Sequence, residues 1–211
     1  MKFGLRLPGA GPFAGPEAIT KFSQKAEELG FDSLWMTDHI ALPVTQETRY
    51  PYREDGKFFW PPETPYLDIV GVLTWASAAT TSINVGSSVL VAGWHDPVAT
   101  AKAFATLDVL NGGRTIMGVG TGWMREQFEM LHYPFETRGA RTTEFISLMK
   151  HLWSEDTIDF QGEHYQYSGF KFYPKPKRQP SIPIWSGGKS EAVLRRVAEV
   201  ADGWHPLYIS A

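Results

Sequence analysis

The sequence predicts an α/β fold built around a parallel β-sheet, in one domain that spans residues 1–211. Short apolar runs alternate with amphipathic stretches along nearly the whole chain, which is the pattern of successive βα units. With 43% hydrophobic and 20% charged residues, the chain can bury one sizeable core. No internal repeat or low-complexity tract divides it.

The first half of the chain contains four predicted strands, each a short apolar run: residues 2–7, 31–37, 83–91 and 115–119. Three predicted helices lie between them: residues 16–29, 66–79 and 97–110. The first helix has apolar residues at helical spacing: Ile19, Phe22, Ala26 and Leu29. It ends at Gly30, and the third helix ends at Asn111 and Gly112, because glycine and asparagine accept the left-handed backbone found at helix ends.

The second half continues this alternation with one interruption. Residues 138–153 form the next predicted helix, with an apolar face made by Phe145, Leu148, Met149 and Leu152. In residues 158–173, by contrast, the apolar residues alternate at period two, which predicts an inserted β-hairpin. A strand at 182–185, a helix at 190–201 and a sixth strand at 203–209 follow.

Residues 40–65 form a connection that is too long to be a simple turn, and such loops tend to be lids or binding walls. The segment is rich in aromatic residues: Tyr50, Tyr52, Phe58, Phe59 and Trp60. These rings could line a substrate pocket, or they could pack the loop onto the rim of the sheet. The sequence leaves both interpretations open.

Composition and charge exclude several classes of function. A formal charge of −3 gives no general attraction to nucleic acid or to an acidic membrane, and Pro176 interrupts the one basic cluster (Lys175, Lys177 and Arg178). The absence of cysteine excludes disulfides, thiolate metal sites and cysteine nucleophiles within this chain. No signal-peptide pattern follows Met1 and no long apolar stretch is present, so we expect a cytoplasmic protein with a small-molecule substrate.

Residue types that carry chemistry recur at the ends of the predicted strands. They are Asp38 and His39, Ser87 and Ser88, Thr121 and Gly122, Ser186 to Gly188, and His205. In a (β/α)8 barrel, all these positions open onto the C-terminal face, where active sites are found. Their shared position is a stronger indication of a site than any single residue.

Asp38 and His39 place a carboxylate beside a group that can exchange a proton near neutral pH. This pair suits acid/base chemistry or contact with the polar edge of a ring. The structural alternative is a strand-end aspartate that caps backbone amides beside a hydrogen-bonded histidine.

Two glycine-containing segments suggest ligand contacts. Residues 118–122 (GVGTG) resemble half of a dinucleotide fingerprint, but Trp123 stands where its last glycine is expected, so we interpret these glycines as an approach surface for a planar ligand. Residues 186–190 (SGGKS) lead into a helix and could hold a phosphate, or could be a tight turn with a capping serine. The remaining histidines lack metal-ligand spacing, so no metal is expected.

Several segments together resemble the luciferase-like monooxygenase superfamily, and within it the branch that depends on the deazaflavin coenzyme F420. They are residues 30–39 (GFDSLWMTDH), 103–108 (AFATLD), 118–128 (GVGTGWMREQF), 138–141 (RGAR), 173–176 (YPKP) and 182–188 (IPIWSGG). The resemblance covers nearly the whole chain in order. It implies a (β/α)8 TIM barrel with an inserted hairpin, of which about six of the eight βα units are present.

The resemblance also implies roles for single residues. His39 would be the catalytic acid/base residue, and Asp38 would contact the polar edge of the cofactor ring. Ser88 and Val89 match a bulge with a non-proline cis peptide behind that ring. Four further positions match cofactor contacts: Thr121, Gly122, Gly187 and Gly188.

One departure concerns a catalytic glutamate. In the sugar-phosphate dehydrogenases of this branch it follows the Thr-Gly pair, where this chain has Trp123. Glu126, one helical turn later, is therefore the second catalytic candidate. Oxidation of a sugar phosphate is not expected.

The leading hypothesis is hydride transfer between coenzyme F420 and an organic substrate. An FMN-dependent monooxygenase that uses oxygen, and a flavin-binding protein without turnover, are the alternatives. A barrel of this kind needs eight strands, and relatives continue through two more βα units. We therefore expect residues 1–211 alone to expose strand edges, to associate or form a homodimer, and to bind cofactor weakly.

Overall fold

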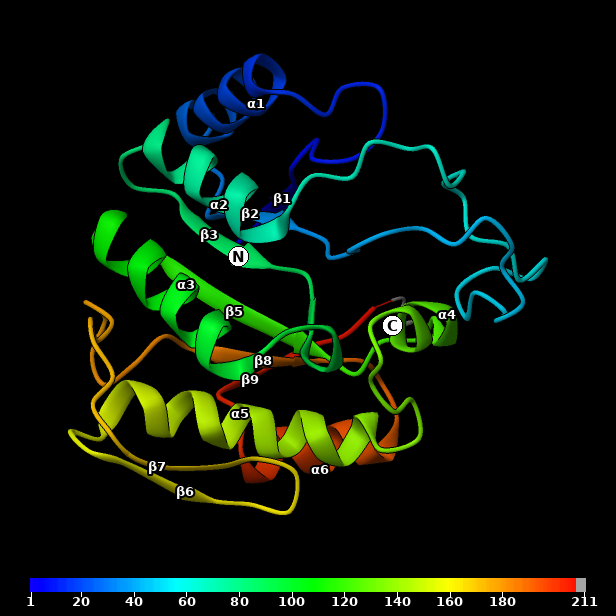
Figure 1. Cartoon of the computed structure of the whole chain (residues 1–211). Coiled ribbons are helices and arrows are strands. Elements are labelled where there is room, and N and C mark those ends of the chain that lie inside the picture. Colours follow the sequence, from blue (N-terminus) through cyan, green and yellow to red (C-terminus); the bar gives the residue numbers. More distant parts are fainter. Residues whose placement is uncertain (208–211) are drawn as a thin grey trace.

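The computed structural model describes residues 1–207 and has an α/β fold in which a curled parallel sheet forms part of a barrel (Figure 1). The sheet has seven strands in the order β1-β2-β3-β5-β8-β9, with β4 also paired to β5. Their bounds are Gly4–Arg6 (β1), Ser33–Met36 (β2), Asn84–Ser87 (β3), Leu90–Val91 (β4), Thr115–Gly120 (β5), Ile184–Gly187 (β8) and Gly203–His205 (β9). All of these pairings are parallel, as the alternating sequence pattern predicts.

The helices cover the convex face of the sheet (Figure 1). The five longer ones match the predicted helices: Pro16–Glu28 (α1), Ile69–Ala78 (α2), Pro97–Leu110 (α3), Arg138–Ser154 (α5) and Glu191–Glu199 (α6). Helix α2 begins three residues later than predicted, because the Asp68 side chain accepts a hydrogen bond from the Gly71 amide and caps the helix there. None of the helices in residues 1–207 is long and apolar enough to cross a membrane.

Three details differ from the expected elements. The predicted strand at 83–91 is divided into β3 and β4 by a bulge at Ser88 and Val89. Two short helices, Ala92–Trp94 (η1) and Arg125–Met130 (α4), were not predicted, because one or two turns carry too little periodicity. The predicted strand at 203–209 is observed as far as His205, and residues 208–211 lie outside the described part of the chain.

The predicted hairpin is confirmed as β6 (Ile158–Gln161) and β7 (Gln166–Phe170), which pair antiparallel outside the main sheet. It lies along α5 (Figure 1, yellow). The Glu144 carboxylate of α5 accepts hydrogen bonds from the backbone amides of His164 and Tyr165, at 3.0 and 2.6 Å. This contact fixes the hairpin to the helix layer.

The core lies between the sheet and the helices, and alternation along each strand determines which side chains enter it. In β2, Leu34 and Met36 are fully buried against the helices, whereas Trp35 faces the concave side. Trp35 crosses directly over Gly86 of β3, where any Cβ would collide with its ring. On the concave face, a large ring thus lies over a glycine of the neighbouring strand.

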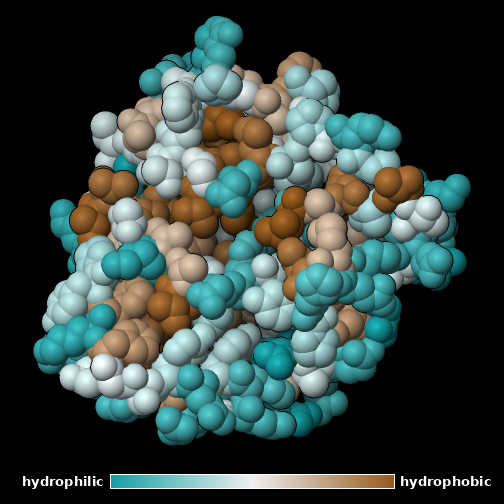
Figure 2. Space-filling view, viewed as in Figure 1, coloured by the Kyte–Doolittle hydropathy of each residue, from teal (hydrophilic) through white to brown (hydrophobic). Residues whose placement is uncertain are grey.

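Apolar side chains also gather on the outer surface. Figure 2 shows them in the upper half of the view, over α1 and α2. A groove of about 300 Å³ runs there and is lined mainly by Ile19, Leu67, Val72 and Trp75. Trp75 is about half exposed, and its indole NH donates to the Thr20 hydroxyl at 2.8 Å.

The Glu27 carboxylate at the end of α1 ties that helix to the start of β3. It accepts hydrogen bonds from three successive backbone amides, those of Thr81, Ser82 and Ile83. Burial acts to raise the pKa of Glu27, but these hydrogen bonds outweigh it and lower the pKa to about 2. The carboxylate therefore stabilises the folded chain wherever it is ionised.

We predict that Glu27→Gln lowers the free energy of unfolding by about 1 kcal/mol at pH 7, a value reduced for the exposure of this group. Since the folded pKa lies below the unfolded value of roughly 4.3, the stabilisation is complete above that value and is lost as the pH falls toward 2. Urea unfolding between pH 2 and pH 7 measures both effects. Glu163→Gln is the control, because Glu163 makes no hydrogen bond within residues 1–207. Equal losses in the two variants would contradict the prediction.

Candidate active site

The residues singled out in the sequence lie along one edge of the sheet, at the carboxyl ends of β2, β3, β5, β8 and β9. These ends are adjacent because the strands are parallel and neighbours in the sheet order. The structure therefore brings together, along that edge, Asp38, His39, Ser88, Val89, Thr121, Gly122, Gly187, Gly188 and His205. Glu126 lies next to them in α4.

The bulge between β3 and β4 has the backbone that the resemblance implied. The peptide bond between Ser88 and Val89 is cis, although Val89 is not a proline. The Ser88 amide donates to the carbonyl of Met36 at 2.7 Å, and the Ser87 hydroxyl donates to the carbonyl of Gly118 at 2.8 Å. The bulge is thus held from β2 on one side and from β5 on the other.

The glycines of β5 make room for this bulge. A Cβ on Gly120 would overlap the Val89 side chain, and a Cβ on Gly118 would overlap the Ser87 carbonyl oxygen. A Cβ on Gly187 of β8 would lie 2.8 Å from a Val89 methyl carbon. The interpretation of Gly118 and Gly120 as an approach surface for a planar ligand is therefore wrong, because the Ser87 carbonyl and the Val89 side chain occupy that space.

Asp38 is turned into the protein. Its side chain is 2% exposed, and one carboxylate oxygen accepts from the Val91 amide at 2.9 Å and contacts Nε2 of His95 at 2.7 Å. Burial acts to lower the pKa of His95, but the hydrogen bond to Asp38 and its negative charge raise the pKa overall. These contacts match the structural alternative for Asp38, in which it caps backbone amides beside a hydrogen-bonded histidine, except that this histidine is His95. Its contact with a cofactor stays a prediction.

His39 makes different contacts from Asp38 and is held by a residue that the sequence analysis missed. Gln127 of α4 has its amide nitrogen 2.6 Å from Nδ1 of His39. The oxygen of the same amide accepts from the Ile40 backbone NH at 3.2 Å. Only its place in the 118–128 segment, one residue after Glu126, gave Gln127 any signal, because a glutamine in a short helix usually faces solvent.

Aromatic rings enclose His39. The ring centroids of Phe58, Tyr66 and Trp94 lie 4.9, 5.1 and 5.6 Å from that of His39. Burial lowers the pKa of His39 to about 4, although the charge of Asp38 opposes this shift. His39 is therefore neutral at pH 7.

The long loop covers this site (Figure 1, cyan). Tyr50 and Phe58 pack on Trp123, with centroid distances of 5.0 and 5.5 Å, and Phe58 also packs on His39. The interpretation that these rings pack the loop onto the rim is confirmed. That they also line a substrate pocket stays a prediction.

Glu126 anchors the loop. One carboxylate oxygen accepts from the backbone amides of Glu47 and Thr48, both at 2.7 Å. Burial acts to raise the pKa of Glu126, but these hydrogen bonds lower it overall. An ionised carboxylate bound to backbone amides is a poor general acid. In this structure Glu126 instead holds the backbone of the loop in place. Its catalytic role remains a prediction.

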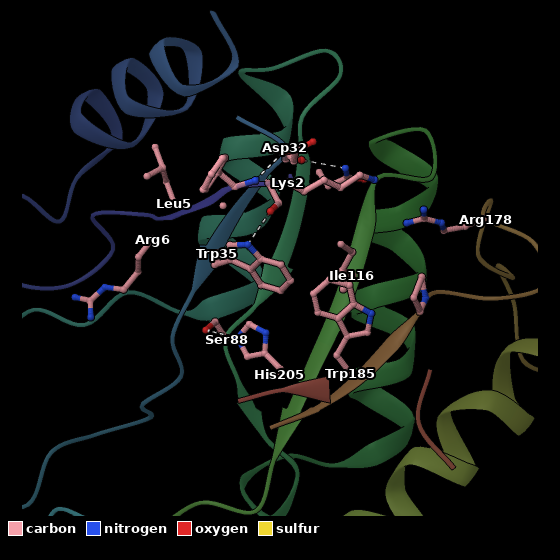
Figure 3. Close-up of a pocket in the computed structure, with 15 residues that line it drawn as sticks. Lys2, Leu5, Arg6, Asp32, Trp35, Ser88, Ile116, Arg178, Trp185 and His205 are labelled. Carbon is pink, nitrogen blue, oxygen red and sulfur yellow. Dashed lines mark hydrogen bonds between the residues drawn. The ribbon is translucent and has the colours of Figure 1, made fainter. Parts of the chain in front are cut away.

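A second group of residues lies deeper, on the concave face. Trp35, Trp185 and His205 point into a cavity of about 570 Å³ from three different strands (Figure 3). Nε2 of His205 is 2.9 Å from the Ser88 hydroxyl, and its ring centroid is 4.9 Å from that of Trp35. His39 does not line this cavity. The cavity is therefore separate from the group around His39, and it extends to the amino-terminal ends of the strands at Asp32, Asn84 and Pro183.

The SGGKS segment forms the turn between β8 and α6. The Ser190 side chain accepts from the Val193 amide and caps the helix, and the Gly188 amide donates to the carbonyl of His205 at 3.3 Å. The capping serine of the structural alternative is confirmed, while phosphate binding by Lys189 stays a prediction. Within residues 1–207, no group of three or more His, Asp or Glu side chains is arranged to hold a metal ion.

This arrangement can bind a ligand against the bulge and present a neutral imidazole to it. Within residues 1–207, Nε2 of His39 has no hydrogen-bond partner, so it can bond to a ligand atom. The surrounding rings exclude water, which strengthens such a bond.

Comparison with known proteins identifies the family. A family model described as luciferase-like monooxygenase matches residues 1–210, and the chain belongs to this family. An uncharacterized protein of Mycobacterium tuberculosis is 35% identical over 198 residues, which cover 91% of this chain and 68% of that protein. An F420-dependent glucose-6-phosphate dehydrogenase of Amycolatopsis mediterranei is 30% identical over 197 residues, which cover 90% of this chain and 53% of the enzyme.

Solved structures agree on the fold. An F420-dependent tetrahydromethanopterin reductase from Methanopyrus kandleri superposes with a TM-score of 0.71 at 22% identity, covering 96% of this chain and 55% of the reductase. A riboflavin lyase superposes with a TM-score of 0.75 at 19% identity, covering 93% of this chain and 52% of the lyase. The chain thus spans about half the length of these structures and of the dehydrogenase.

We predict that Gly120→Ala lowers the free energy of unfolding by about 1–3 kcal/mol, because its Cβ overlaps the Val89 side chain. Val89→Ala in the same chain should restore part of the loss, which a double-mutant cycle of urea unfolding measures. Gly139→Ala is the control, since only the tip of Arg196 lies near its Cβ, at 3.8 Å. Strictly additive effects of the two substitutions would show that the glycine and the bulge do not constrain each other.

Proposed function

We propose that the protein is an F420-dependent oxidoreductase that transfers a hydride to or from an organic substrate. The observation that carries this proposal is a neutral histidine, His39, held by Gln127 at the same edge of the sheet as the Ser88–Val89 bulge. Relatives with at least 30% identity that are named F420-dependent glucose-6-phosphate dehydrogenases support the choice of cofactor.

The residues at the mouth fit a flat ring with a polar edge. Val89 fills the space over Gly120 and Gly187, so the bulge presents a backbone surface on which a ring can lie. Ser88 offers a hydroxyl at this surface, and Thr121 has no hydrogen-bond partner within residues 1–207. These residues and the glycine turn of β8 would hold the cofactor. When bound, the deazaflavin would supply or accept the hydride.

The surroundings of His39 favour an organic substrate with apolar groups over a sugar phosphate. The wall facing the imidazole is made of Phe58, Tyr66 and Trp123. Trp123 stands where the sugar-phosphate dehydrogenases of this branch have a glutamate, and no cationic side chain bonds to His39 or to this wall within residues 1–207. The negatively charged phosphate of a sugar phosphate would have few hydrogen-bond donors or cations to contact at this wall.

The second candidate is an FMN-dependent monooxygenase that uses oxygen. It is favoured by the description of the family as monooxygenases and by the solved riboflavin lyase, which contains a modified FMN. Both candidates use the same edge of the sheet.

A fluorescence titration of the full-length protein with F420 and with FMN separates them. We predict that F420 binds at least ten times more tightly than FMN, because the segment around Trp123 and the dehydrogenase relatives both favour the deazaflavin. Tighter binding of FMN, or purification of a yellow protein that contains FMN, would reject this prediction in favour of the monooxygenase.

We predict that His39→Ala lowers turnover by about two to four powers of ten while cofactor affinity changes only a few-fold, as expected when a group acting at the reacting atoms is lost. Steady-state kinetics and cofactor titration of the same variant measure the two quantities. His132→Asn is the control, because asparagine tolerates the positive φ of 59° at that position and the His132 side chain makes no hydrogen bond within residues 1–207. Parallel loss of affinity and turnover would mean that His39 has a structural role.

A further inference from the structure

We infer that Gln127 is a positioning residue that fixes His39 as the Nε2–H tautomer. His39 then serves as a neutral hydrogen-bond donor to a substrate oxygen, and not as a base. This inference rests on the proposed function for the identity of that oxygen. The tautomer itself depends only on contacts within the chain.

The orientation of the Gln127 amide is determined by its neighbours. The residue is 1% exposed, so each polar atom of its side chain needs a partner inside the protein. The Ile40 backbone NH is a donor, so the Gln127 atom that contacts it must be the oxygen. The amide nitrogen then faces His39 and also lies 3.0 Å from the sulfur of Met124, a weak acceptor. A flipped amide would place two donors against each other at Ile40.

This orientation determines the position of the proton on His39. The amide nitrogen of Gln127 can only donate, so Nδ1 of His39, 2.6 Å away, must accept with its lone pair. A neutral imidazole carries one proton, and with Nδ1 acting as acceptor that proton is on Nε2. Nε2 has no partner within residues 1–207 and therefore offers its hydrogen to a ligand.

The charge state follows from burial. The aromatic enclosure lowers the pKa of His39 to about 4, so the ring is neutral over the range in which most enzymes work. A neutral imidazole in this tautomer has no free lone pair with which to accept a proton at Nε2. It can, however, polarise a carbonyl or stabilise an oxygen that gains negative charge, while keeping its own proton.

Other titratable groups near His39 are engaged elsewhere. The carboxylates of Asp38 and Glu126 accept hydrogen bonds from backbone amides, and Asp38 also contacts His95. The Tyr66 hydroxyl bonds to the hydroxyl of Thr37. Of the groups packed around His39 within residues 1–207, only Gln127 therefore contacts its Nδ1. The amide of Gln127 is thus the group that decides the tautomer.

The test is a nitrogen NMR spectrum of the full-length protein labelled with 15N-histidine, recorded without cofactor. The His39 resonances are assigned by their absence from the His39→Gln variant. Between pH 5 and pH 8 we expect a protonated, pyrrole-like Nε2 and an unprotonated, pyridine-like Nδ1. A proton on Nδ1, or exchange between the two tautomers, would overturn the inference whether or not F420 proves to be the cofactor.

Substitution of Gln127 tests the causal step. In Gln127→Glu the carboxylate can accept from both the Ile40 NH and Nδ1–H, so the proton should move to Nδ1. In Gln127→Leu neither bond is possible, and the two tautomers should mix. Gln166→Glu makes the same chemical change on exposed strand β7 and should leave the His39 spectrum unchanged. Unchanged His39 resonances in both Gln127 variants would refute the positioning role.

Turnover provides an independent readout. We expect Gln127→Glu to lower kcat by about a hundredfold with KM altered only a few-fold, the size expected for losing one donor to a developing oxyanion. His39→Gln, which keeps an NH donor, should retain at least ten times more activity than His39→Ala. Equal activity of these two His39 variants would overturn the role of His39 as a hydrogen-bond donor. A deazaflavin that fails to bind would reject the proposed function and leave the tautomer result standing.

Discussion

The bulge between β3 and β4 is the constraint on which the rest of the site depends. It exists because β5 and β8 carry glycine where it projects, so that Val89 can lie over Gly120 and Gly187. Beyond the bulge, β4 continues along β5, and the Val91 amide reaches the buried carboxylate of Asp38 at 2.9 Å. The chain then forms η1, and the ring of Trp94 in this short helix packs on His39. A side chain on Gly120 or Gly187 would displace Val89 and with it the contacts that follow the bulge.

The fold was largely predictable because its signals are local and repeated. Helix α3 was predicted at its observed bounds, since Pro97 begins it and Asn111 ends it. The location of the site was predictable for the same reason, because the carboxyl ends of neighbouring parallel strands must meet. What the sequence could not give were the directions of side chains at those ends. Asp38 and His39 are adjacent in the segment after β2, yet the Asp38 carboxylate bonds to Val91 and His95 whereas the His39 ring contacts Gln127.

Gln127 shows a second limit of sequence reasoning. Its importance comes from two partners, Ile40 and His39, that are 87 and 88 residues away in the chain. No local pattern separates a glutamine that reaches such partners from one that faces solvent. The glycines of β5 show a different limit. The sequence shows that these positions lack a side chain, but only the structure shows that Val89 takes up the space where one would be.

The loop and the catalytic candidate are connected through one turn of α4. Glu126 holds the backbone of the loop at Glu47 and Thr48, and the next residue, Gln127, holds the imidazole of His39. Both residues belong to a helix of only six residues, so the backbone of the loop and the imidazole of His39 are positioned by the same short element. The loop therefore contributes to the site in two ways. Its aromatic rings form the wall beside His39, and its backbone is bonded to the helix that orients the His39 donor.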